Sequence, residues 1–103
     1  DEVTALYAAD AVLLPTMSAE VRHNHTEIRD YFVQFLAKKP VGRIDEQNIR
    51  IYGDIAVNSG LYTFSVSEGG VESDVPARFT FVYRSDGGRW PIIEHHSSVL
   101  PEG

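Results

Sequence analysis

Arg78 and Thr80 belong to a run of alternating side chains that could bring a positive charge into a binding pocket. Successive side chains of a strand point to opposite faces, so Arg78 and Thr80 share one face while Phe79 and Phe81 share the other. An arginine in a pocket can hold a carboxylate through two parallel hydrogen bonds. The pattern therefore predicts a site for a carboxylate-bearing small molecule; a surface arginine paired with an acidic residue is the alternative.

His95 and His96 are candidates for acid–base chemistry, because histidine titrates near neutral pH. As neighbours on a strand they face opposite ways and cannot share one site. We expect the face that places Arg78 in the pocket to include His95 and Ser97 as well. A hydrogen-bonded structural histidine is the alternative for either residue taken alone.

His23 and His25 are separated by one residue and resemble a pair of metal ligands. Two such histidines could share a metal on a strand, but at the start of a helix their side chains diverge. No third ligand lies nearby in the sequence, and the chain contains no cysteine. We therefore expect no metal site and no cofactor.

A helix over residues 24–38 is the element that the pattern predicts most directly. Asn24 can cap its first turn, and Glu27, three residues on, can complete a capping box. Pro40 prevents the helix from continuing. One face of this helix is apolar and consists of Ile28, Phe32, Phe35 and Leu36.

The other elements are a short opening helix and a series of strands. Residues 2–9 have the spacing of a helix, and residues 10–14 that of a strand ended by Pro15. After Gly42, alternation and glycine-rich turns predict strands at residues 48–52, 55–67, 75–84 and 90–99. Helices followed by consecutive strands imply one α+β domain over residues 1–103 with an antiparallel sheet.

Composition excludes several classes of function. The 103 residues include no cysteine, so disulfides, thiol catalysis and thiolate metal sites are excluded, and a cytoplasmic location is compatible with this. The net charge of −6 and the dispersed Lys and Arg residues argue against nucleic-acid binding. No apolar run is long enough to span a membrane.

Three segments of the second half resemble the nuclear transport factor 2-like superfamily. They are Ile-Tyr-Gly-Asp-Ile-Ala at 51–56, Val-Pro-Ala-Arg-Phe-Thr-Phe-Val-Tyr-Arg at 75–84 and Asp-Gly-Gly-Arg-Trp-Pro-Ile-Ile-Glu-His-His-Ser-Ser at 86–98. Within that superfamily the chain is similar to bacterial proteins related to the association domain of calcium/calmodulin-dependent protein kinase II. The resemblance implies the cystatin-like cone fold, in which N-terminal helices wrap a strongly curved antiparallel sheet. The family's first long helix is missing from this chain.

The resemblance also implies a pocket between helices and sheet, and a homodimer formed through the outer sheet face. It places Tyr62 in the pocket, because Tyr62 shares a strand with one of the family's pocket arginines. Ser97 stands where the kinase has another pocket arginine, which puts the kinase's ligand preference in doubt here. The site predicted from these combined arguments consists of Arg78, His95, Tyr62, Thr80 and Ser97.

Three functions remain open at this stage. The first is an oligomerisation and small-ligand-binding module, with catalysis less expected than binding. The second is an enzyme like SnoaL or ketosteroid isomerase, in which Asp10 or His95 abstracts a proton next to a carbonyl and Tyr62 stabilises the oxyanion. Asp10 as a turn or cap residue is the alternative for that side chain. The third is a purely structural dimer with a vestigial pocket.

Overall fold

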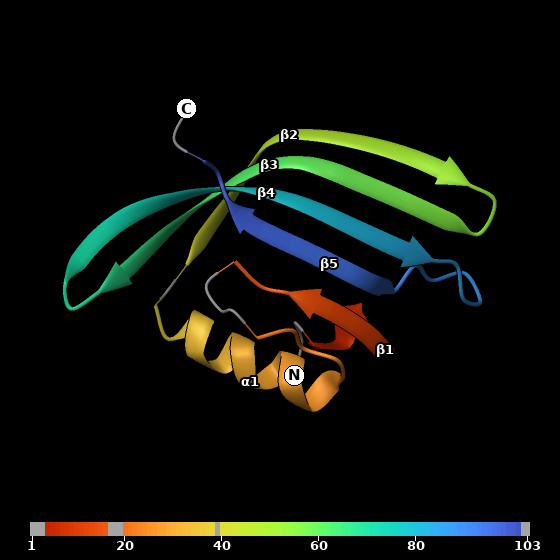
Figure 1. The fold of residues 1–103 in the computed structure, drawn as a ribbon, viewed down its shortest axis with the longest axis horizontal. Helices are drawn as coiled ribbons and strands as arrows, with labels where there is room; N and C mark the ends of the chain where they lie inside the picture. Colours follow the sequence, from red (N-terminus) through yellow and green to blue (C-terminus); the bar gives the residue numbers. More distant parts are fainter. Residues whose placement is uncertain (1–3, 17–19, 39, 102–103) are drawn as a thin grey trace.

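The structure is a computed structural model that describes residues 4–16, 20–38 and 40–101. Its five strands form one sheet in the order β1-β5-β4-β3-β2. Figure 1 shows that the sheet curves over a single α-helix, which lies on its concave side. The elements are η1 (Thr4–Leu6), β1 (Tyr7–Leu14), α1 (His25–Leu36), β2 (Val41–Tyr52), β3 (Ile55–Glu68), β4 (Val71–Arg84) and β5 (Ile92–Val99).

The fold is the α+β cone predicted from the sequence, and the main differences lie in its first strands. Residues 4–6 form one 3-10 turn and β1 already begins at Tyr7, so the predicted helix over residues 2–9 is wrong where the chain is described; residues 2 and 3 lie outside the described part. β2 begins at Val41, seven residues before the predicted strand. β1 pairs with β5 in parallel, whereas the strands from β2 to β5 are antiparallel as predicted.

The start of α1 follows the predicted capping pattern. Asn24 is the N-cap, and its side chain accepts a hydrogen bond from the Glu27 amide at 3.0 Å. The Glu27 carboxylate reaches back one residue further than a capping box requires and accepts the His23 amide at 2.8 Å. The helix therefore starts at a defined place, which sets the position of its inner face against the sheet.

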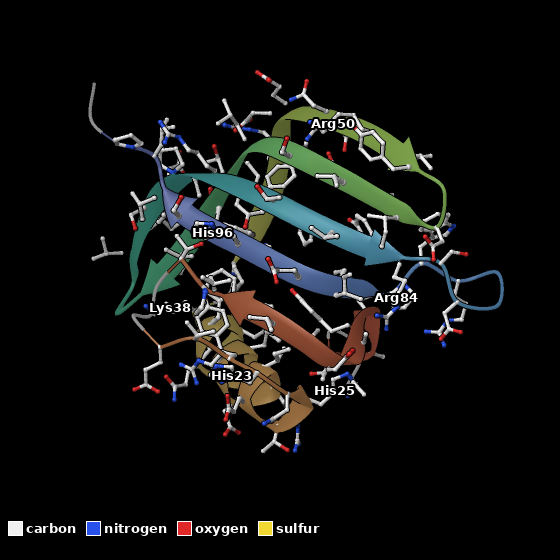
Figure 2. All side chains as sticks on the ribbon, turned by 45° about the vertical axis from the view of Figure 1, so that its right-hand side comes forward. His23, His25, Lys38, Arg50, Arg84 and His96 are labelled. Carbon is white, nitrogen blue, oxygen red and sulfur yellow. The ribbon has the colours of Figure 1, made fainter. Side chains whose placement is uncertain are left out.

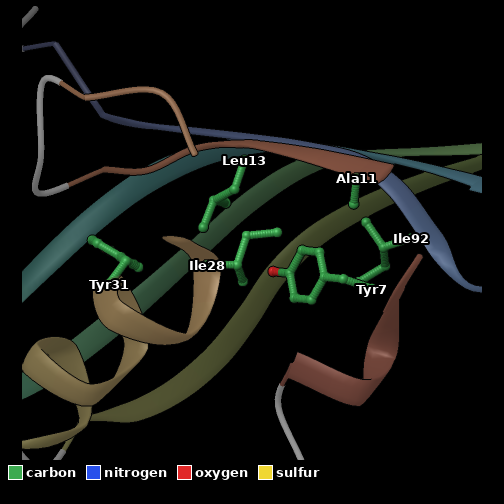
Figure 3. Packing of buried hydrophobic residues seen from close by; sticks show 6 residues of the cluster. All are labelled: Tyr7, Ala11, Leu13, Ile28, Tyr31 and Ile92. Atoms are coloured by element: carbon green, nitrogen blue, oxygen red, sulfur yellow. The ribbon is translucent and has the colours of Figure 1, made fainter. Parts of the chain in front are cut away.

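One cluster of buried side chains attaches α1 to the sheet. Ile28 is fully buried and lies between Leu13 and Tyr7 in Figure 3. Tyr31 is buried with them, whereas Leu36, predicted on the same face, is 46% exposed. Burial of one such apolar side chain contributes about 1.5–3 kcal/mol, so this cluster is the main attachment of the helix.

The curvature of the sheet has a local cause at the pairing of β2 with β3. The register shifts between Ile44 and Glu46, which places the extra residue of a β-bulge at Asp45. Opposite the bulge, a Cβ atom on Gly60 would lie only 2.0 Å from the Glu46 carbonyl oxygen. Only glycine allows this close approach of two backbones, and the strand bends there.

No helix in the described part of the chain is long and apolar enough to cross a bilayer.

Candidate functional site

A small cavity of about 30 Å³ lies between α1 and the concave face of the sheet. That volume admits about one or two water molecules or a small functional group. Its walls come from α1, from the projecting part of the β3–β4 hairpin and from the ends of β1 and β5. The lining residues are Leu13, Pro15, Thr16, Tyr31, Phe32, Phe35, Tyr62, Phe64, Val66, Val75, His95 and Ser97.

A chain of hydrogen bonds crosses the sheet side of this cavity. The Tyr7 hydroxyl lies 2.8 Å from His95 Nδ1, and the Tyr62 hydroxyl lies 3.1 Å from His95 Nε2. Tyr62 also donates to Ser97 Oγ at 2.5 Å. The Ser97 hydroxyl in turn bonds the Thr16 hydroxyl. Side chains from β1, β3 and β5 and from the segment after β1 therefore form one connected polar network.

The donor and acceptor roles in this network assign the tautomer of His95. Because Tyr62 gives its only hydroxyl hydrogen to Ser97, its oxygen accepts from His95, and Nε2 must carry the hydrogen. Nδ1 is then an acceptor and takes the hydrogen of Tyr7. Both ring nitrogens of His95 are thus engaged.

The network is uncharged at neutral pH. Burial lowers the pKa of His95 from 6.5 to about 3, with the neighbouring His96 contributing in the same direction. Burial raises the pKa of Tyr62 to about 12 and raises the pKa of Tyr7 well above its ordinary value. None of the described lining residues carries a formal positive charge; Arg22 lies 5.7 Å from the Tyr31 ring centroid but does not line the cavity.

Three of the five predicted site residues meet at the cavity, namely Tyr62, His95 and Ser97. The Tyr62 hydroxyl is hydrogen-bonded to both Ser97 and His95, so the three side chains are connected. The predicted face of β5 is therefore the face that lines the cavity. Whether any of these residues binds a ligand stays a prediction.

The placement of Arg78 and Thr80 in the pocket is wrong. Arg78 pairs with Ser98 and Thr80 with His96, so both share the convex face with the residues that point away from the cavity. Arg78 is exposed, whereas Phe79, its neighbour, is buried. The phenyl rings occupy the inner face because burying them is favourable and burying an unpaired guanidinium is costly.

Asp10 is also outside the cavity. Its carboxylate is exposed and lies 3.8 Å from Arg84 Nη2, in the middle of β1. A proton-abstraction mechanism with Asp10 as the base is therefore incompatible with this structure, because the base must be within hydrogen-bond reach of the substrate.

His23 and His25 lie on different sides of the start of α1 (Figure 2). His23 Nδ1 is 3.1 Å from a Glu27 carboxylate oxygen, and His25 Nε2 is 2.8 Å from the Tyr7 carbonyl oxygen. Across the described residues, no three His, Asp or Glu side chains are grouped as a metal ion requires.

Sequence reasoning missed Thr16 and the part that Tyr7 plays in holding His95. Both depend on β1 lying parallel to β5, with Leu13 beside His95 and Leu14 beside His96. The pairing ends at Leu14, and two residues further on the Thr16 hydroxyl bonds the Ser97 hydroxyl. Both residues could have been predicted only from a parallel pairing of the first and last strands. The local sequence pattern does not indicate such a pairing.

Comparison with known proteins agrees with this fold. A family model described as the calcium/calmodulin dependent protein kinase II association domain matches residues 1–101. One crystal structure is that of a Xanthomonas campestris protein proposed to be such an association domain. Its sequence is 50% identical to this chain, and the two structures superpose with a TM-score of 0.94. The match covers 99% of this chain and 74% of the other.

More distant structures share the fold alone. The S. rosetta CaMKII hub is 14% identical with a TM-score of 0.79, covering 95% of this chain and 79% of that one. A proposed ketosteroid isomerase from Shewanella frigidimarina is 23% identical with a TM-score of 0.77, covering 93% and 78%. No curated protein sequence matches the chain. Because the family model matches residues 1–101 and a solved relative is 50% identical in sequence, the chain belongs to the calcium/calmodulin-dependent protein kinase II association domain family.

Proposed function

We propose that this chain is a self-associating module with a small-ligand pocket under α1, and that copies of it associate through the convex face of the sheet. The observation that carries the proposal is that α1, the only α-helix of the described residues, lies on the opposite, concave face (Figure 1). The name of the S. rosetta relative, a hub, supports the same idea.

The side chains of the convex face suit contact between identical copies. Val82 pairs with Val57 across β3 and β4, and Leu61 lies on the same face two rows away. Arg78 and Glu94 flank this apolar centre with opposite charges. In a two-fold dimer each patch meets its own copy, so a mixture of apolar residues and both charges is self-complementary. A stable dimer buries upwards of about 1,200 Å² in total.

The experiment is analytical ultracentrifugation of the wild type, of Leu61→Asp and of a control, Val33→Asp. Val33 is 56% exposed and belongs to α1, which lies on the concave side of the sheet (Figure 1). We expect the wild type and Val33→Asp to be dimers or larger. Leu61→Asp should be a monomer that still unfolds cooperatively. A monomeric wild type, or unchanged assembly of Leu61→Asp, would contradict the proposal.

The pocket supports a binding role more than a catalytic one. Its walls are apolar and its polar groups are neutral hydroxyls and one neutral imidazole. Catalysis by proton abstraction needs a base with a free lone pair, and both nitrogens of His95 already take part in hydrogen bonds. With Arg78 on the other face, the reason for expecting a carboxylate ligand is gone.

A further inference from the structure

A groove of about 480 Å³ lies at the end of the sheet where β4 turns back into β5. Its walls come from η1, from the first half of β1, from the start of α1 and from the segment between β4 and β5. The groove and the cavity under α1 share none of their described lining residues, so the two are separate. Its volume is within the range of small-molecule sites.

The turn between β4 and β5 holds two opposite charges beside each other in this groove. Gly87 and Gly88 have φ angles of 57° and 88°, as the central residues of a two-residue hairpin turn require. Asp86 and Arg89 exchange two backbone hydrogen bonds across the turn, at 2.8 and 3.0 Å, so their side chains share a face. Both residues line the groove, and neither side chain has an ion-pair or hydrogen-bond partner among the described residues.

A second pair of opposite charges lines the same groove. Arg84 Nη2 and Asp10 Oδ1 are 3.8 Å apart, which is too long for a hydrogen bond, so both groups can still bond a ligand. His25 lies at the same end of the molecule as Arg84 (Figure 2). Its Nε2 is 2.8 Å from the Tyr7 carbonyl oxygen, and because a carbonyl oxygen only accepts, Nε2 carries hydrogen. In the neutral ring, Nδ1 is then a further acceptor.

The charged side chains of the groove suit a ligand that carries both charges. Two arginines and two aspartates line it, so their formal charges sum to zero. A simple anion would be attracted by the arginines but repelled by the aspartates, and a simple cation would meet the reverse. A zwitterion can place its carboxylate on guanidinium groups and its ammonium on carboxylates, with charge-assisted hydrogen bonds to both. Apolar contact comes from Ala5, Ala8 and Pro91.

We propose that this groove is a binding site for a free amino acid or a similar small zwitterion. Arg84 and Arg89 bind the carboxylate of the ligand. Asp10 and Asp86 bind its ammonium group, and its apolar side chain lies against Pro91. This is a second site, apart from the pocket under α1, and it does not rest on the proposed function.

The test uses three matched probes on ¹⁵N-labelled protein. They are L-leucine, 4-methylpentanoate, which lacks the ammonium group, and 3-methylbutylammonium, which lacks the carboxylate. Chemical-shift titration of the backbone amides gives the affinity and the location of each probe. We expect L-leucine to shift the amides of Asp10, Arg84, Asp86 and Arg89. Each singly charged probe should bind at least about threefold more weakly, because it loses its contacts with one pair of charges and is repelled by that pair.

Two variants remove one charge each. Arg89→Gln should weaken L-leucine about threefold and leave 3-methylbutylammonium bound equally or more tightly, because a repelling charge is gone. Asp86→Asn should weaken L-leucine by a similar factor and leave 4-methylpentanoate bound equally or more tightly. A general loss of structure would not produce this crossed pattern. Arg50→Gln on β2, an exposed arginine outside the groove (Figure 2), is the matched control and should leave all three affinities unchanged.

The inference is overturned if either singly charged probe binds as tightly as L-leucine, or if either variant leaves the affinity for L-leucine unchanged. Shifts confined to the amides around the pocket under α1 also overturn it, and they would instead support the ligand-binding part of the proposed function. If none of the three probes binds, the groove is a solvated surface and the inference falls. Self-association is measured separately by ultracentrifugation, with other variants.

Discussion

The concave face of the sheet has two halves that differ in what covers them. Under α1, Tyr62 and Phe79 are 7% and 3% exposed. At the other end, where β2 and β3 extend beyond the helix (Figure 1), Ile49 and Ile51 are 60% and 66% exposed. Both halves are built from alternating strands with apolar residues on this face.

This difference indicates that the site depends on coverage of the sheet by α1 rather than on the alternating pattern of the strands. The helix excludes water from its half of the sheet. Burial without water lowers the pKa of His95 and strengthens the hydrogen bonds among the hydroxyl groups. In the open half, Tyr83 and Trp90 line a shallow apolar groove together with Ile51. Its lining is apolar apart from Asn58 and the polar atoms of Tyr83 and Trp90, so we assign it no ligand.

The largest expected difference between the halves is in core packing. Ile28→Ala should lower the free energy of unfolding by about 2–5 kcal/mol, because it leaves a cavity between α1 and the sheet. Ile51→Ala, the matched change in the open half, should lower it by less than about 1 kcal/mol. Urea denaturation of both variants checks this. Equal losses would mean that the open half is covered in solution, and the comparison would fail.

The next effect concerns the bulge between the halves. Gly60→Ala should cost about 3 kcal/mol, because the new methyl group would collide with the Glu46 carbonyl. Gly42→Ala is the control: its methyl group would meet only the edge of the Phe64 ring, at 3.2 Å, and a side chain yields more easily than backbone. Thermal unfolding of the two variants measures the difference. A Gly60→Ala protein as stable as Gly42→Ala would contradict the bulge as the origin of the bend.

The elements that the sequence predicted correctly are those specified by neighbours in the chain. Asn24 and Glu27 predicted the start of α1, and alternation with the Gly69–Gly70 turn predicted the β3–β4 hairpin. The early part of β2 was missed because its residues are exposed on every side and show no alternation in hydrophobicity. The parallel partner of β1 was missed because it lies about 80 residues away, and local pattern does not report such pairings.

The site was predicted in part for a related reason. His95 and Ser97 share a face whatever their partner strand is, so that part needed only strand geometry. Placing Arg78 needed the register between β4 and β5 as well. A shift of one residue exchanges the two faces, and here Phe79, not Arg78, pairs with Ser97.

A third difference should appear as a pH dependence that belongs to the covered half. Because the folded state holds His95 neutral, with a pKa lowered from 6.5 to about 3, only the unfolded chain takes up this proton between those values. Stability should therefore fall as the pH falls below about 6.5, by about 2 kcal/mol between pH 7 and pH 5. Urea denaturation at several pH values, compared with His95→Gln, measures it. The slope should be smaller in the variant, and identical slopes would contradict a neutral His95.

The smallest effect isolates one hydroxyl group. Tyr62→Phe should cost about 1 kcal/mol, because it removes the link between His95 and Ser97 while keeping the ring. Tyr52→Phe is the control on the open end of β2, where the ring is 61% exposed, and should change stability by less than about 0.5 kcal/mol. Thermal unfolding checks both. A Tyr62→Phe protein with unchanged stability would mean that the hydroxyl chain contributes nothing.

The most direct test of the covered site is the protonation state of His95 itself. A long-range ¹H–¹⁵N NMR spectrum, with the His95 signals identified by their loss in His95→Gln, reports which ring nitrogen carries hydrogen. We predict a neutral ring with hydrogen on Nε2 and none on Nδ1 at pH 7, unchanged down to about pH 5. A ring that titrates near 6.5, or one that carries its hydrogen on Nδ1, would contradict the network on which the site depends.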